Sequence, residues 1–111
     1  MWLKLITSLV TVFLLLGCSS GQEEVPLGFL VLHSGSYEGR TLGVKGRVRG
    51  LEEPEHYWLE DKHYNRVGLT PGSAVQDYLD QQVRVVGRFQ ASSDHGRQLH
   101  VRAIERLESP P

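Results

Sequence analysis

Two segments of the chain alternate between apolar and polar residues, and each carries a glycine in its apolar phase. They are residues 41–50 and 82–90, which share the pattern V-x-G-R-(V/F) at 44–48 and 85–89. Alternation of this kind predicts β-strands with one buried face. A glycine on the buried face of a strand is typical of a sharp bend, a bulge or a close backbone approach. The pattern therefore predicts two long strands that coil around one small barrel, the alternative being a chance match of common residues.

Three further segments have the composition and alternation of strands. They are residues 56–61, 64–70 and 97–107, with a turn at 61–63 and a hairpin loop at 91–96. In the last of them the apolar phase slips between Ala103 and Ile104. Residues 71–81 predict a helix of about two turns with Ser73 as its N-cap. Residues 27–32 are either an extra edge strand or a short helix that caps the barrel.

The predicted elements follow the order long strand, strand, strand, helix, long strand, strand. This order resembles the OB-fold, a five-stranded Greek-key barrel with one short helix between strands 3 and 4. The resemblance covers residues 27–108 and rests on topology and spacing, without a catalytic signature. It implies an all-β domain of small helical content, which binds any ligand on the outer face of its first three strands.

The first 17 residues have the pattern of a secretory signal peptide. Lys4 gives a short basic head, residues 5–16 carry no charge, and the small Gly17 precedes the only cysteine, Cys18. The apolar run of about 12 residues is shorter than the roughly 20 that a membrane-spanning helix needs. The start of the chain is therefore expected to direct export rather than to span a bilayer.

Leu15-Leu16-Gly17-Cys18 resembles the lipobox of bacterial lipoproteins, although that family favours a small residue where Leu16 stands. The resemblance implies cleavage before Cys18 and attachment of diacylglycerol, with palmitate-type chains, to its sulfur. Several acyl chains hold a protein firmly on a membrane. Because Ser19 is not acidic, the resemblance implies the periplasmic side of the outer membrane rather than the inner membrane. The alternative is a buried cysteine in the first helix of a cytosolic protein.

The lipobox divides the chain into four expected parts. They are a signal peptide at 1–17, the lipidated cysteine and a flexible tether at 18–26, the barrel at 27–108 and a disordered tail at 109–111. The signal peptide contains one of the 12 basic residues and none of the 13 acidic ones, so the mature net charge is about −2. This balance gives no bulk electrostatic reason to expect nucleic acid as a partner.

The candidate binding face combines one aromatic residue with basic neighbours. If Leu59 faces inward, Trp58 faces outward, where a stacked planar ligand gains about 1–3 kcal/mol. The alternatives are that Trp58 packs against the stems of Arg47 and Arg66, or that it is buried. The candidate ligand-binding residues are Trp58, Arg47, Lys45, Arg66 and His56.

Metal and catalytic chemistry have less support. His56 and His63 lie on or beside one hairpin with acidic neighbours, but neither the H-x-E nor the H-E-x-x-H spacing occurs. We therefore expect no metal and no cofactor. The chain has no G-x-S-x-G motif, and the adjacency of His33 to Ser34 does not make a catalytic triad. No catalytic residue and no enzymatic activity are expected.

Together these features predict a non-enzymatic binding module, anchored to the outer membrane through its N-terminal lipid. The expected partner is another component of the cell envelope, with a protein as the first expectation. The first alternative is a small-ligand or cation-binding module that takes an anionic glycan, a phosphate-bearing ligand or an oligonucleotide on the Trp58 face. The second is a structural module that offers a sheet edge to which a partner adds a strand.

Overall fold

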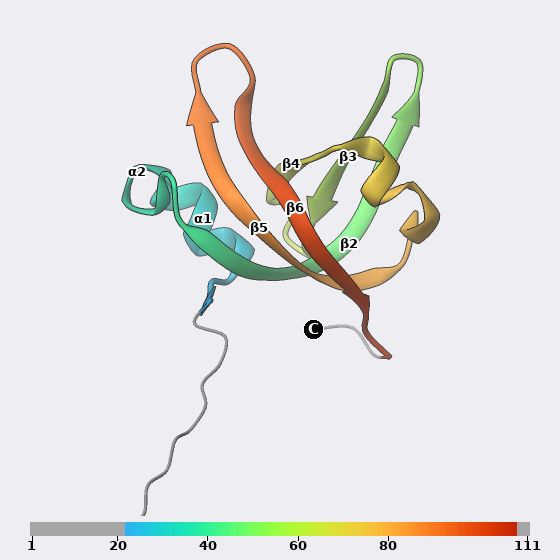
Figure 1. Cartoon of the computed structure of the whole chain (residues 1–111), viewed down its shortest axis with the longest axis horizontal. Helices are drawn as coiled ribbons and strands as arrows, with labels where there is room; N and C mark the ends of the chain where they lie inside the picture. The colour runs from blue at the N-terminus through green and yellow to red at the C-terminus, as the bar shows by residue number, and fades with distance from the viewer. Residues whose placement is uncertain (1–21, 109–111) are drawn as a thin grey trace, which may run out of the picture.

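One long strand organises the fold, because three other strands pair with it. The computed structural model describes residues 22–108, and in it strand β2 (Thr41–Glu52) runs along the base of the sheet and up into the right-hand hairpin of Figure 1. The first half of β2 pairs antiparallel with β5 (Gln82–Ser92), and its second half pairs antiparallel with β3 (Glu55–Glu60). A short strand, β1 (Glu23–Glu24), pairs parallel with the start of β2.

The two remaining strands complete a single sheet. β4 (Arg66–Thr70) pairs antiparallel with β3 and parallel with β6 (Gly96–Arg106), which in turn pairs antiparallel with β5. The order is β1-β2-β3-β4-β6-β5, and the additional β2–β5 pairing leads back to β2. The domain is therefore mainly β, as the sequence predicts. Figure 1 shows the β2–β3 and β5–β6 hairpins splaying apart from a shared base.

The two glycines of the shared pattern lie at close backbone approaches. A methyl group built on Gly46 would lie 2.9 Å from the carbonyl oxygen of Glu60, and one built on Gly87 would lie 2.7 Å from that of His100. Neither position has room for a side chain unless the backbone moves. Close approach was one of the three meanings that a glycine in the buried phase can have.

A β-bulge accounts for the phase slip in the last strand. Val86 pairs with Ala103 while Gly87 pairs with Val101, so Arg102 is an extra residue in β6. One inserted residue moves every later side chain to the other face of the strand. The inward phase therefore runs to Val101 and resumes at Ile104, so the slip lies at Arg102 and not, as predicted, between Ala103 and Ile104, and Ala103 is exposed.

The segment between β4 and β5 differs from the predicted two-turn helix. It forms two 3-10 turns, η1 (Gly72–Ala74) and η2 (Gln76–Tyr78), and no side chain caps either of them, so Ser73 is not an N-cap. Val75 lies between the turns and is fully buried. One fully buried valine anchors the segment to the core. The segment therefore does not need the continuous apolar face that a two-turn α-helix would present to the core.

The beginning of the described chain belongs to the folded domain. Residues 27–32 form a short helix, α1 (Leu27–Leu32), and not an edge strand. A second short helix, α2 (Ser34–Tyr37), follows it. Val25 is only 3% exposed and packs in the core. The tether expected at 18–26 is therefore too long at its C-terminal end, because β1 and Val25 are part of the fold. Cys18, the signal peptide expected at 1–17 and the tail expected at 109–111 lie outside the described residues.

The core is entirely apolar. All six apolar residues predicted to face inward from the two long strands are fully buried: Leu42, Val44, Val48, Val83, Val85 and Phe89. Among residues 22–108 no charged or polar side chain is buried. In the same part of the chain, no helix has the length and hydropathy to cross a membrane. The groups available for binding therefore lie on the surface.

Candidate functional site

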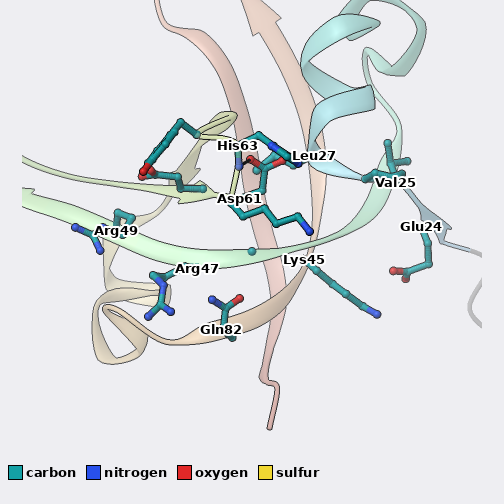
Figure 2. A pocket seen from close by; sticks show the side chains of 14 residues that line it. Glu24, Val25, Leu27, Lys45, Arg47, Arg49, Asp61, His63 and Gln82 are labelled. Atoms are coloured by element: carbon teal, nitrogen blue, oxygen red, sulfur yellow. Dashed lines mark hydrogen bonds between the residues drawn. The ribbon is translucent and has the colours of Figure 1, made fainter. Parts of the chain in front are cut away.

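A groove with a volume of about 760 Å³ opens where β2 passes between the ends of β1 and β3 (Figure 2). We call it the β2 groove. One wall is residues 24–27, the opposite wall is residues 60–64, and Gln82 of β5 lies at its lower side. Three basic side chains, Lys45, Arg47 and Arg49, stand in a row along the strand in Figure 2. Alternation along β2 produces this row, since every second residue faces away from the core.

The basic residues of the groove differ in how firmly they are held. Arg47 donates a hydrogen bond from Nη1 to the carbonyl oxygen of Asp80 at 2.6 Å, and Arg49 Nη1 lies 3.3 Å from the Asp80 carboxylate. Lys45 and Lys62 form no ion pair with any residue that the structure describes. The ammonium groups of Lys45 and Lys62 are thus available to an incoming anion. The guanidinium groups of Arg47 and Arg49 are held by Asp80 at one end of the groove.

The acidic residues of the groove are engaged within the domain. Glu24 accepts a hydrogen bond from Arg84 Nε at 2.8 Å, and this bond, helped by the charges of Arg84 and Lys45, lowers the pKa of its carboxyl. Glu60 accepts a hydrogen bond from Trp58 Nε1 at 3.0 Å. Arg84 therefore offsets the charge of Glu24, and Arg66 Nε, 3.9 Å from the Glu60 carboxylate, partly offsets that of Glu60.

The third acidic residue, Asp61, organises the turn between β3 and β4. Its Oδ1 accepts the backbone N–H groups of His63 and Asn65, and its Oδ2 accepts Asn65 Nδ2, all at 2.9 Å. Partial burial alone would raise the pKa of Asp61, but these hydrogen bonds outweigh it, and the pKa lies below its usual value. The turn is therefore fixed by a carboxylate that remains charged at neutral pH.

This turn presents an aromatic residue at the edge of the groove. Tyr64 is 76% exposed and has φ 67°, the left-handed conformation that a bulky side chain rarely adopts. Strain of this kind persists only where the surroundings impose it, and it occurs often at binding sites. The fixed backbone of the turn thus presents an exposed tyrosine to a ligand in the groove.

The five candidate residues from the sequence fall into two separate places. Lys45 and Arg47 line the β2 groove, whereas His56, Trp58 and Arg66 line a second, shallower hollow of about 200 Å³ with Gly68, Arg97 and Gln98. The structure therefore does not bring the five together around one ligand.

Trp58 faces outward, because its neighbour Leu59 points into the core. The Trp58 side chain is nevertheless partly buried. The Arg66 guanidinium lies 4.8 Å from the Trp58 ring centre, and the His56 ring lies 5.0 Å from it. The alternative in which arginine packs on this indole is thus realised by Arg66. Arg47 takes no part, because its guanidinium is bound to Asp80.

The two histidines near the β3–β4 hairpin are also separated. His56 stacks near Trp58, while His63 lines the β2 groove. Within residues 22–108 no three histidine, cysteine, aspartate or glutamate side chains are grouped closely enough to hold a metal ion. The histidines therefore do not converge with described carboxylates on one site.

Residues 24–27, Lys62 and Tyr64 were not candidates from the sequence, yet they form both walls of the groove. Asp61 at the start of the turn predicted at 61–63 was the available signal, because an aspartate side chain often accepts a hydrogen bond from the backbone two residues further on. A scan against protein-family models finds no match for the chain, and a search of curated proteins finds none either. The function has to be inferred from the chemistry of these surfaces.

Proposed function

We propose that the protein is a lipid-anchored, non-enzymatic binding module of the bacterial envelope, which holds another envelope protein in its β2 groove. The lipobox-like Leu15-Leu16-Gly17-Cys18 supports the anchor, and Ser19 supports the periplasmic side of the outer membrane. The observation that carries the binding role is the groove itself. It joins two available ammonium groups to an exposed tyrosine on a hydrogen-bonded turn.

We propose further that the domain is an OB-like barrel with one added strand. The pairings β2–β3–β4–β6–β5–β2 support a closed five-stranded ring, and the parallel β4–β6 pair joins its third and fifth strands. β1 and α1 are additions at the start. OB-folds usually bind ligands on the face of strands one to three, near the hairpin loops. The β2 groove is a different surface, at the end where β1 and the β3–β4 turn lie.

A second function has its own supporting observation. The hollow around Trp58 carries Arg66 and Arg97, so a phosphate-bearing ligand or an anionic glycan would meet both an aromatic surface and positive charge there. The Arg66 guanidinium already occupies one face of the indole, however, and the hollow is much the smaller of the two. We therefore place this candidate second, and we do not propose nucleic acid as a partner.

Site-specific photocrosslinking in cells tests the main proposal. A benzoylphenylalanine replaces Tyr64 at the groove, His56 at the hollow or Asp94 in the exposed β5–β6 turn, in three full-length variants. We expect one discrete protein adduct from position 64 that positions 56 and 94 do not give. An adduct from position 56 alone would favour the second function. Equal adducts from all three positions, or none, would contradict a groove-specific partner.

A further inference from the structure

A short stretch of β2 has a strand neighbour on one side only. β1 pairs with β2 at Leu42 and Gly43, and β3 pairs with it only from Arg47 onward. On the opposite side β5 pairs with every residue of β2 from 41 to 47. Within the described part of the chain, residues 44–46 therefore face an open gap in the sheet. The gap is the floor of the β2 groove.

The backbone of Lys45 points into this gap. Peptide groups of successive residues in a strand turn to opposite sides, so alternate residues share a side. Gly43 accepts a hydrogen bond from the N–H of Val25 on the β1 side, whereas Val48 donates to Gln81 and accepts from Asp80 on the β5 side. Lys45 is two residues beyond Gly43, so its N–H and its C=O both face the groove.

We propose that this gap is a docking slot for an extended, acidic peptide segment of a partner protein. One residue of that segment forms backbone hydrogen bonds with Lys45, as in β-strand addition limited to a single residue pair. The inference rests on the proposed function and specifies the partner chemistry at the same groove. The partner chain enters between the wall at residues 24–27 and the wall at residues 60–64.

The size of the gap limits how the segment binds. Gly43 and Arg47 are four residues apart, or roughly 13 Å along the strand at 3.3 Å per residue, and neighbouring strands lie about 4.8 Å apart. The slot therefore admits a segment that lies beside β2 for about one residue and turns out of the gap at either end, but not a long strand lying along β2. Because only one backbone pair forms, side-chain contacts have to supply much of the affinity.

The charges of the groove select an acidic segment. Lys45 and Lys62 are available beside the slot, and Arg47 and Arg49 extend the basic row along β2. Of the groove carboxylates, Glu24 is paired with Arg84 and Glu60 lies 3.9 Å from Arg66 Nε, so Asp61 is the one carboxylate without a cationic partner in the described part of the chain, against two available lysines. Carboxylates of an incoming peptide would therefore pair with the ammonium groups, while Tyr64 contacts an apolar residue between them.

Peptide binding to the full-length lipidated protein in detergent micelles tests the slot. The probe is a fluorescent ten-residue peptide that alternates glutamate and valine; a second peptide has the same sequence with N-methylated valines, and a third has lysine for glutamate. We expect saturable binding of the first, with slowed hydrogen exchange of the Lys45 amide. N-methylation should weaken binding about tenfold or more, equivalent to about 1.4 kcal/mol, and the lysine peptide should not bind.

Three variants separate the backbone contact from the charge. Lys45→Ala removes the ammonium group, and Lys45→Pro also removes the N–H that faces the slot. Arg102→Ala is the matched control, because Arg102 is exposed on the β6 bulge, outside the groove. We expect the glutamate–valine peptide to lose affinity in the order Lys45→Pro, then Lys45→Ala, with no change for Arg102→Ala. The N-methylated peptide gives the same answer on the unmodified protein if Lys45→Pro does not fold.

The outcomes distinguish this inference from the proposed function. Equal binding of the N-methylated peptide, or protection around Trp58 instead of Lys45, would overturn the slot. Competition by phosphatidylglycerol vesicles or inorganic phosphate, together with indifference to N-methylation, would show an anion site rather than a peptide slot. A position-64 adduct in cells without peptide binding would refute the slot and leave the binding function standing. Loss of both results would refute both proposals.

Discussion

Tyr64 donates its backbone N–H to the carbonyl oxygen of Asp61 at 3.0 Å, and this contact closes the turn that presents the tyrosine ring at the β2 groove. The carboxylate of Asp61 binds the next backbone groups of the same turn. The position of the exposed ring thus depends on partly buried hydrogen bonds beneath it. The strained residue and the carboxylate that fixes the turn lie within five residues of each other.

Replacing Tyr64 with glycine should separate binding from stability. Glycine adopts a φ of 67° without the steric cost that tyrosine bears, so the free energy of unfolding should stay within about 1 kcal/mol of the original or rise. Affinity for the glutamate–valine peptide should fall. Urea unfolding and anisotropy measure the two quantities. A large loss of stability would mean that Tyr64 is mainly structural, and Gly35→Ala, at an open site, is the control for a neutral change.

Asp61→Ala should destabilise the domain by about 1–2 kcal/mol, because three hydrogen bonds to one carboxylate are lost. It should also loosen Tyr64 and weaken peptide binding. Urea unfolding monitored by circular dichroism measures the first effect. Asp94→Ala, in the exposed β5–β6 turn, is the matched control, and equal effects of the two substitutions would contradict the role of the Asp61 turn.

Stability should decline in acid with a contribution from Glu24 and Asp61. Both pKa values are lower in the folded state than their ordinary values of 4.5 and 3.8, so the unfolded chain binds more protons as the pH falls. Their contribution is complete above the ordinary values and is lost as the pH falls through the folded ones. Unfolding at pH 7, 5 and 3 should show a shallower acid loss for Asp61→Asn than for the original protein; an identical or steeper loss would contradict this assignment.

Gly46→Ala and Gly87→Ala should each destabilise the domain by about 1–3 kcal/mol, since the added methyl would lie within 3 Å of a carbonyl oxygen. Gly35→Ala again serves as the control, because nothing lies within 4 Å of its added methyl. Thermal unfolding of the three variants provides the comparison. Wild-type stability of both strand variants would mean that the neighbouring backbone does not approach Gly46 and Gly87 this closely.

Mass spectrometry of the protein from its native host tests the anchor. We expect a chain that starts at Cys18 and carries acyl chains, and we expect Cys18→Ser to move the protein out of the membrane fraction. Ser19→Ala is the control, since it leaves the cysteine in place. Recovery of an uncleaved chain with an unmodified cysteine would refute the proposed location and the envelope partner with it.

Local alternation was sufficient to predict the long strands and their buried residues, and it indicated an irregularity in β6, although one residue away from the observed bulge at Arg102. Those features depend on neighbours within a few positions of the chain. The 3-10 turns around Val75 were not predictable in the same way, because one buried contact with the core, rather than helix propensity, determines that path.

The candidate site was predictable only in part. The basic row on β2 follows from alternation, but its walls come from residues about 20 positions away on either side along the chain. Nothing local in Glu23–Glu24 indicates a strand, since two acidic residues gain their place by pairing with Leu42 and Gly43. Trp58 was the obvious aromatic residue, yet the exposed ring at the groove belongs to Tyr64, whose position depends on the Asp61 turn.

The shortness of β1 has a mechanical consequence. Tension applied to the chain upstream of Glu23 would shear β1 along β2, resisted by two backbone pairings and by the ion pairs Glu23–Arg40 and Glu24–Arg84. Peeling β1 away would remove the groove wall that starts at Glu24. If the chain is anchored as proposed, tension between the anchor and the domain would weaken binding in the β2 groove, and a slack connection would leave the groove intact.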